Sequence, residues 1–202
     1  MEHPVIISGG GIIGCYVHLR LKQAGISSQI IEKGPSLTSL SSNIRTISLN
    51  PSTYKLLLEI GIELESASVE TIKVSDGDGS GKIQFTANEV DEEALSHVAM
   101  FNELLEKIQD KASNAIQFES EIISVSKLDK LTKITLSNNC ELQTSLLIGS
   151  DGRNSPVAQL SNFISKTNDY KQTAFTFLAK EASDDNNSTA VSYTHLTLPT
   201  KA

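Results

Sequence analysis

Short apolar runs separated by amphipathic stretches mark the beginning of this chain. Residues 5–7 read Val-Ile-Ile, and a run that is apolar at every position predicts a strand buried on both faces of a parallel sheet. A helical pattern follows as far as Gly25, and a second apolar run ends at Glu32. The order of these elements predicts a strand–helix–strand unit over residues 4–33 and an α/β fold.

Capping and turn residues organise the region that follows. Residues 33–43 are rich in serine and contain a Gly-Pro pair, which indicates a loop. Asn50 is a favoured N-cap, and Pro51 suits the first position of a helix. The sequence therefore predicts a helix over residues 52–60, ended by Gly61.

A β-hairpin is predicted next. Residues 69–75 alternate between polar and apolar positions, residues 76–81 have the composition of a turn, and residues 82–87 return as a second strand. Acidic side chains dominate residues 89–93, which indicates a solvated connection.

Strands predominate in the remaining part of the chain. A short strand is predicted at 97–101, and Asn102 is predicted to cap a helix that runs to residue 113. Asn138 and Asn139 indicate a turn. Further short strands are predicted at residues 116–119, 122–128, 133–136 and 142–148.

The last of these strands leads into Gly-Ser-Asp-Gly at residues 149–152. An apolar strand that ends in this way places Asp151 and the flexible Gly152 at the carboxyl edge of a sheet, where open α/β sheets bind ligands. Taken alone, the Asp-Gly pair is also compatible with a plain turn that binds nothing.

A dinucleotide-binding pattern lies in the first unit, with the spacing Gly-x-Gly-x-x-Gly at Gly9, Gly11 and Gly14. In this pattern the first glycine allows a tight turn, the second lets backbone approach a pyrophosphate, and the third lets the helix pack near the sheet. Glu32 lies 18 positions after the last glycine, where an acid binds a ribose 2′-hydroxyl and disfavours a 2′-phosphate. The pattern predicts FAD or NAD(H) at the helix N-terminus rather than NADP(H). The alternative is a glycine-rich turn without a ligand.

Composition narrows the classes of function. The chain has 202 residues, a formal net charge of −7 and no basic cluster, which argues against a nucleic-acid-binding protein. Its two cysteines, Cys15 and Cys140, have no metal-ligand spacing and form no disulfide framework, so a reducing compartment is expected. No signal peptide and no membrane-spanning apolar run is visible, so the sequence predicts a cytoplasmic protein.

Three segments together resemble the class A flavoprotein monooxygenases, most closely the UbiH-type hydroxylases of ubiquinone biosynthesis. The first is the glycine–glutamate unit. The second is Arg-Thr-Ile-Ser-Leu at 45–49 with the helix after it, and the third is 147–155, which is similar to the family motif Gly-Ala-Asp-Gly-x-x-Ser. The sequence Tyr-Lys-Gln-Thr-Ala at 170–174 also resembles the Tyr-x-Gln-x-Ala strand of this branch, and the resemblance covers residues 4–190.

The resemblance implies FAD as the cofactor, with NADH or NADPH as a possible electron donor. Arg45 matches an arginine that lies near the flavin and its phosphates, although an ordinary surface arginine is the alternative. Asp151 would accept hydrogen bonds from the ribityl–pyrophosphate region, and Glu32 would bind the adenosine ribose. No catalytic residue and no metal ligand is assigned. The predicted cofactor-binding residues are Gly9, Gly11, Ile12, Ile13, Gly14, Glu32, Lys33, Arg45, Asp151 and Gly152.

The family also implies an architecture. It predicts a Rossmann-like FAD-binding domain of the glutathione-reductase type over residues 1–68 and 95–160, interleaved with part of a β-rich substrate domain over 69–94 and 161–190. Residues 191–202 match nothing in the family at that point and resemble a translated sequencing adapter. We therefore expect a non-native tail there, on a truncated N-terminal portion of a longer protein.

The implied activity is hydroxylation of an aromatic ring of a polyprenylated ubiquinone precursor, using O₂ and a reduced nicotinamide cofactor or another donor. Two alternatives stay open: a related flavin-dependent hydroxylase or reductase of another substrate, and a dinucleotide-binding fragment without catalysis. The expected partner is a small aromatic or quinone-type molecule. A polyprenyl substrate would favour peripheral association with the inner membrane or with partner proteins, and the oligomeric state is left open.

Overall fold

The structure is a computed structural model that describes residues 3–35, 45–75, 80–164, 166, 168–173 and 188–192. The chain forms two compact units, one over residues 1–43 and 102–175 and the other over 44–101 and 176–202. Parts of five sequence predictions lie outside the described residues: 36–43 of the serine-rich loop, 76–79 of the hairpin turn, residue 174 of the Tyr-x-Gln-x-Ala segment, 165, 167 and 174–187 of the substrate-domain segment, and 193–202 of the tail. The predicted domain boundaries stay a prediction.

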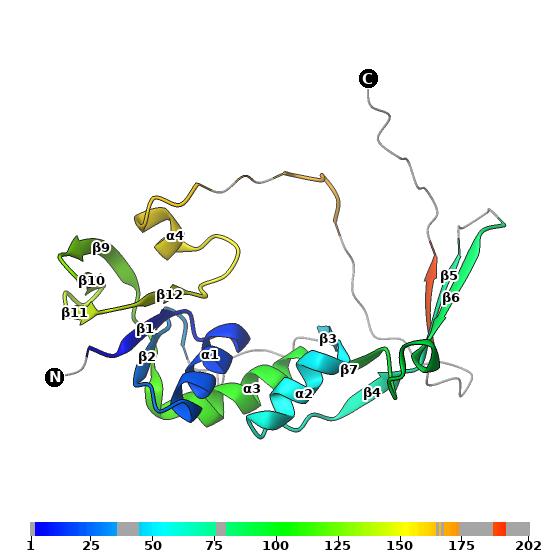
Figure 1. Ribbon diagram of the computed structural model, residues 1–202. Helices are drawn as coiled ribbons and strands as arrows, with labels where there is room; N and C mark the ends of the chain where they lie inside the picture. Colours follow the sequence, from blue (N-terminus) through cyan, green and yellow to red (C-terminus); the bar gives the residue numbers. More distant parts are fainter. Residues whose placement is uncertain are drawn as a thin grey trace. The chain divides into compact units, whose positions relative to one another are not determined.

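A parallel sheet forms the centre of the first unit (Figure 1). Its strands are β1 (Val5–Ser8), β2 (Ser28–Ile31), β8 (Ile116–Gln117) and β12 (Leu147–Gly149), in the order β12-β1-β2-β8. The helix α1 (Ile12–Gln23) connects β1 to β2. The predicted strand–helix–strand unit is confirmed, and β1 is buried along its whole length as its sequence predicts.

The helix α3 (Phe101–Ala112) begins two residues earlier than a helix capped by Asn102 would begin. The Phe101 N–H donates to the Arg45 carbonyl at 2.9 Å, so residue 101 both closes a strand ladder and starts the helix. Asn102 therefore lies inside the first turn, and its prediction as the N-cap is wrong. The apolar face is as expected, because Leu104 and Ile108 are fully buried. A short 3-10 helix, η3 (Ser113–Ala115), leads on to β8.

A second, antiparallel sheet of the first unit contains β9 (Ile122–Leu128), β10 (Leu131–Leu136) and β11 (Glu141–Thr144) in the order β11-β10-β9. The prediction of one continuous strand over 142–148 is wrong, because β11 and β12 belong to different sheets. The Thr144 hydroxyl donates to the Pro4 carbonyl at 2.7 Å and accepts from the Leu146 N–H at 3.1 Å. These contacts satisfy backbone groups at the point where the chain changes sheets.

The two sheets share one apolar core with the short helix α4 (Pro156–Leu160). Burial of this cluster fixes the position of the turn that connects β12 to α4, because Val157 is anchored in it. The buried members of the cluster are Ile6, Ile31, Ile122, Ile134, Leu136 and Val157.

The second unit has a three-stranded antiparallel sheet of β3 (Thr46–Leu49), β7 (Ser96–Met100) and β4 (Ser66–Val69), in the order β3-β7-β4. The helix α2 (Pro51–Glu59) follows β3. Its predicted cap is confirmed, because Asn50 Oδ1 accepts from the Thr53 N–H at 2.7 Å.

The predicted hairpin is formed by β5 (Thr71–Ser75) and β6 (Lys82–Thr86), which pair antiparallel. The strand predicted at 69–75 is divided, since β4 ends at Val69 and β5 begins two residues later. The acidic connection contains a 3-10 helix, η2 (Ala87–Val90). A capping box between Thr86 and Glu89 caps its N-terminus. The strand β13 (Ser188–Ser192) pairs parallel with β5.

Among the described helices, none has the length and apolar character needed to cross a bilayer.

Candidate cofactor-binding site

A cavity of about 260 Å³ lies in the first unit, where β1, β2 and β12 end. The carboxyl ends of parallel strands meet at one edge of a sheet, and ligands of open α/β folds bind at this edge. The residues that line the cavity come from the glycine turn, the end of β2, the start of β9 and the turn after β12: Ser8, Gly9, Gly11, Ile31, Glu32, Lys33, Ser120, Glu121, Ile122, Ser150, Asp151, Gly152 and Pro156.

Close backbone packing explains two of the three motif glycines. Gly9 has a φ of 101°, and a Cβ there would lie 2.5 Å from the Ser150 carbonyl oxygen. A Cβ on Gly14 would overlap the Gly9 carbonyl oxygen and approach Ser150 Oγ to 2.7 Å. The Ser150 hydroxyl in turn donates to the Ser8 carbonyl at 2.8 Å. The strand ends and the start of α1 are therefore in backbone contact, with no room for side chains.

The third motif glycine faces open space. A Cβ on Gly11 would meet nothing within 4 Å, and Gly11 lines the cavity. Gly11 is also the N-cap residue of α1, whose cap makes no side-chain hydrogen bond and whose first turn has no acidic residue. Helix N-termini present N–H donors and a partial positive charge. This geometry leaves space and donors for an anion such as a pyrophosphate.

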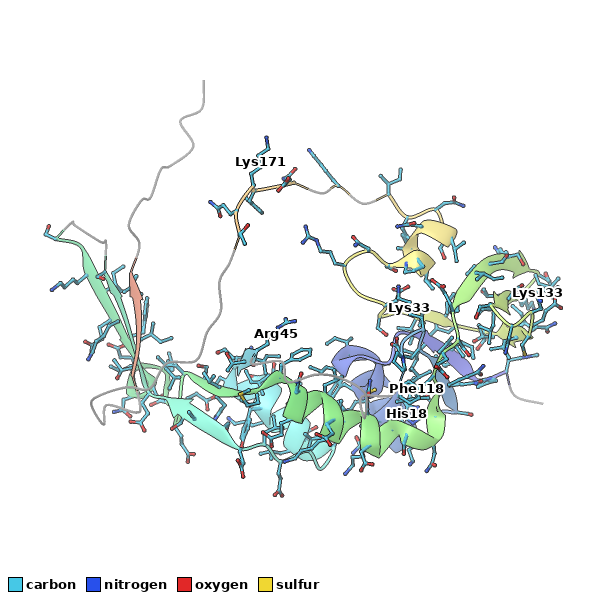
Figure 2. The ribbon with its side chains drawn as sticks, turned by 180° about the vertical axis from the view of Figure 1, so that it is seen from behind. His18, Lys33, Arg45, Phe118, Lys133 and Lys171 are labelled. Carbon is cyan, nitrogen blue, oxygen red and sulfur yellow. The ribbon has the colours of Figure 1, made fainter. Side chains whose placement is uncertain are left out.

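Glu32 ties the end of β2 to the glycine turn. Its Oε2 accepts from the Gly10 N–H at 2.6 Å, and its Oε1 accepts from the Gly34 N–H at 2.7 Å. An ionised carboxylate offers about four acceptor sites, so the two contacts leave capacity for a ligand hydroxyl. Lys33 follows at the carboxyl end of β2, where its exposed side chain is labelled in Figure 2.

Asp151 combines a structural contact with an unused acceptor. Its Oδ2 accepts from the Val157 N–H at 3.0 Å and from Ser8 Oγ at 3.3 Å. Its Oδ1 is buried and has no hydrogen-bond partner among the described residues. An unsatisfied buried acceptor is costly and calls for an explanation. A ligand hydroxyl that donated to Oδ1 would satisfy this acceptor. The sugar hydroxyls of a dinucleotide are donors of this kind.

The structure brings six of the predicted site residues together in this cavity: Gly9, Gly11, Glu32, Lys33, Asp151 and Gly152. The predicted residues Ile12, Ile13 and Gly14 begin α1 but do not line it. Arg45 belongs to the second unit, where its guanidinium lies 4.5 Å from the centroid of the Phe101 ring. Cofactor binding by each of these residues stays a prediction.

One wall of the cavity, formed by Ser120, Glu121 and Ile122, was not predicted from the sequence. These residues follow β8, which pairs parallel with β2. The signal was present in part, because residues 116–119 were predicted as a strand. Identifying that strand as parallel would have placed the residues after it at the ligand-binding edge.

Cys15 is fully buried, and its Sγ donates to the Gly10 carbonyl oxygen of the glycine turn at 3.3 Å. Burial, with a smaller contribution from the negative charge of Glu32, raises the pKa of its thiol to about 12. Because only the thiolate is strongly nucleophilic, we expect Ellman's reagent at pH 8 to modify the exposed Cys140 and leave Cys15 unmodified. The expected titration is one thiol in the folded protein and two in denaturant. Two thiols reacting in the folded protein would contradict the buried position of Cys15.

Comparisons with known proteins agree with this geometry. The FAD binding domain family matches residues 2–197. The chain is 29% identical to Monooxygenase 1 of Arabidopsis thaliana over 165 residues, which cover 78% of this chain and 40% of that protein. It is 25% identical to the mitochondrial ubiquinone biosynthesis monooxygenase COQ6 of Caenorhabditis elegans over 209 residues, covering 93% and 46%. The chain thus spans about half the length of the curated relatives it matches.

Solved structures share the fold at lower sequence identity. PqsL of P. aeruginosa, in complex with 2-aminobenzoylacetate, superposes with a TM-score of 0.70 at 18% identity, covering 84% of this chain and 48% of that one. The architecture is therefore the Rossmann-like α/β fold of FAD-binding domains, accompanied by β-rich structure in the second unit. The match over nearly the whole sequence shows that this chain belongs to the FAD-binding family of the class A flavin monooxygenases, whose cofactor is FAD.

Proposed function

We propose that the protein containing this chain is a UbiH-type, FAD-dependent monooxygenase that hydroxylates an aromatic ring of a polyprenylated ubiquinone precursor. The observation that carries the FAD site is the cavity at the carboxyl edge, where the buried Asp151 Oδ1 lacks a partner and Gly11 leaves open space. The substrate class is supported by similarity to the COQ6 protein of Caenorhabditis elegans over 93% of this chain.

In this proposal the chain's residues bind and orient the cofactor. The N–H groups at the start of α1, from Gly11 to Gly14, face the pyrophosphate, while Gly9 keeps the turn tight. Glu32 accepts from the adenosine ribose next to Lys33, and Asp151 accepts from the ribityl–pyrophosphate region. Arg45 belongs to the second unit, and its place near the flavin stays an expectation from the family resemblance. Bound FAD would supply the redox chemistry, with NADH or NADPH as electron donor and O₂ as the source of the hydroxyl oxygen.

The test is a reaction of the purified full-length protein with FAD, O₂ and a short-chain prenylated phenol. We expect bound flavin by its absorbance, NAD(P)H oxidation that depends on the phenol, and a product heavier by one oxygen in mass spectrometry. Labelled O₂ should contribute that oxygen. A full-length protein that binds no flavin would refute the proposal. Flavin binding without hydroxylation of any prenylated phenol would refute the substrate class.

A second candidate keeps the chemistry and changes the substrate. The identity to Monooxygenase 1 of Arabidopsis thaliana, 29%, is higher than the 25% to the Caenorhabditis elegans COQ6 protein. Sequence identity therefore supports a flavin-dependent hydroxylase of another substrate, such as an unprenylated phenol, as the second candidate, because the name Monooxygenase 1 specifies no substrate, whereas the COQ6 relative matches more of the chain. A comparison of kcat/KM for prenylated and unprenylated phenols separates the two candidates. Sedimentation with vesicles also separates them, because only the hydroxylase of a polyprenylated substrate is expected to bind a membrane surface.

Replacing Asp151 with asparagine is expected to weaken FAD binding roughly 5- to 10-fold, because one acceptor oxygen becomes a donor at the cavity. The asparagine oxygen can still accept from the Val157 N–H, so the free energy of unfolding without FAD should change by less than about 1 kcal/mol. Flavin fluorescence titration and thermal melts measure the two quantities. An unchanged dissociation constant would remove Asp151 from the site.

A further inference from the structure

Gln109, on α3, makes a hydrogen bond to the backbone of the glycine turn. Its Nε2 donates to the Gly10 carbonyl oxygen at 2.6 Å. The opposite orientation of the amide is excluded, because it would bring two acceptor oxygens together. Cys15 Sγ donates to the same carbonyl at 3.3 Å, and the Gly10 N–H donates to Glu32 Oε2. Both polar groups of Gly10 are thus engaged by side chains from other elements.

The hydrogen bonds to the Gly10 carbonyl also determine the direction of the Gly11 N–H, because both groups belong to one planar peptide. The described residues contain no cis peptide bond, so the Gly10–Gly11 peptide is trans. In a trans peptide the carbonyl and the following N–H point in opposite directions. Because the Gly10 carbonyl points toward Gln109 and Cys15, the Gly11 N–H points away from them. Gly11 lines the cavity, with open space where a side chain would stand.

We propose that Gln109 is a positioning residue for the cofactor: by holding the Gly10 carbonyl inward, it directs the Gly11 N–H toward the pyrophosphate. The inference rests on the proposed FAD site. Gln109 is not among the residues that line the cavity, so it acts through the peptide and does not touch the ligand. Its Oε1 is buried without a partner among the described residues. An apolar side chain at position 109 would avoid the cost of this unpaired acceptor. The contact that a glutamine adds there is the hydrogen bond from Nε2 to the Gly10 carbonyl oxygen.

The test compares Gln109→Leu with Gln29→Leu in the purified protein. Gln29 is a matched control, because its amide also bonds another side chain, Gln117, at 3.1 Å, but it lies outside the cavity lining. Fluorescence titration gives the FAD dissociation constant, and displacement by ADP isolates binding through the pyrophosphate without the flavin. We expect Gln109→Leu to weaken both FAD and ADP roughly 3- to 10-fold and Gln29→Leu to weaken neither.

A second variant covers the case in which Gln109→Leu does not fold. Gln109→Glu keeps the size of the side chain, but its ionised carboxylate cannot donate to the Gly10 carbonyl. It should bind FAD weakly at pH 8 and approach the wild type as the carboxyl is protonated at lower pH. If whichever variant folds binds FAD and ADP within twofold of the wild type at pH 8, Gln109 does not position the turn. If the wild type itself binds no FAD, the proposed function fails instead.

Discussion

Replacing Gly9 with alanine is expected to cost at least about 3 kcal/mol of unfolding free energy. Two effects add at this position. The φ of 101° is unfavourable for any residue with a Cβ, and that Cβ would lie 2.5–2.8 Å from three backbone atoms of Ser150 and Asp151. Backbone cannot rotate away as a side chain can, so β1 and β12 would have to separate. Chemical denaturation followed by circular dichroism measures the loss.

Gly25 is the matched control for this substitution. Its φ is 74°, yet a Cβ there would meet nothing within 4 Å. Gly25→Ala therefore incurs only the left-handed backbone cost of about 1–2 kcal/mol. The difference between the two variants isolates the close approach between the glycine turn and the turn after β12. Equal losses would mean that this close approach is not present in solution.

Replacing Gly11 with alanine is expected to weaken FAD binding roughly 10- to 100-fold while leaving the fold intact. The backbone of Gly11, with φ −73° and ψ −176°, is ordinary for alanine. The new methyl group would meet no protein atom within 4 Å, and it would stand where the pyrophosphate is proposed to approach. Flavin fluorescence titration and a thermal melt without FAD measure the two effects separately.

Gly25→Ala again provides the comparison, because it should lower stability and leave the FAD dissociation constant unchanged. The two variants thus have opposite expected profiles. Should Gly11→Ala bind FAD as tightly as the wild type, the cofactor does not approach the start of α1, and the proposed site is wrong.

Local signals were sufficient to predict much of this fold. The apolar run at β1, the glycine spacing and the acid after β2 predicted a strand–helix–strand unit that the structure contains. The Asn50 cap and the strand at 122–128 were also predicted to the residue. The Asn50 cap depends on a contact three residues away, and the burial of the strands is recorded in their local apolar pattern, so the signal for each element lies within the element itself.

Features that depend on distant partners were not predictable in this way. The run from 142 to 148 gives no sign of the change of sheet, because the change depends on the Thr144 hydroxyl meeting the Pro4 carbonyl. The wall after β8 depends on its pairing with β2. The role of Gln109 depends on contact with Gly10, which no local pattern records. The glycine turn, Glu32 and Asp151 could therefore be predicted from the sequence. The wall after β8 and the contact from Gln109 could not.

The pairing of β1 with β12 has a consequence for synthesis in the cell. Ile6 pairs with Leu147, so about 140 residues must leave the ribosome before the edge of β1 facing β12 is covered. At roughly 5–20 residues per second this takes roughly 7–30 s. During that interval β1, which is apolar at three of its four positions, has an open edge, which favours aggregation. The glycine turn is translated before β12, so its surroundings are completed late, and the yield of folded protein should depend on chaperones that protect the nascent β1.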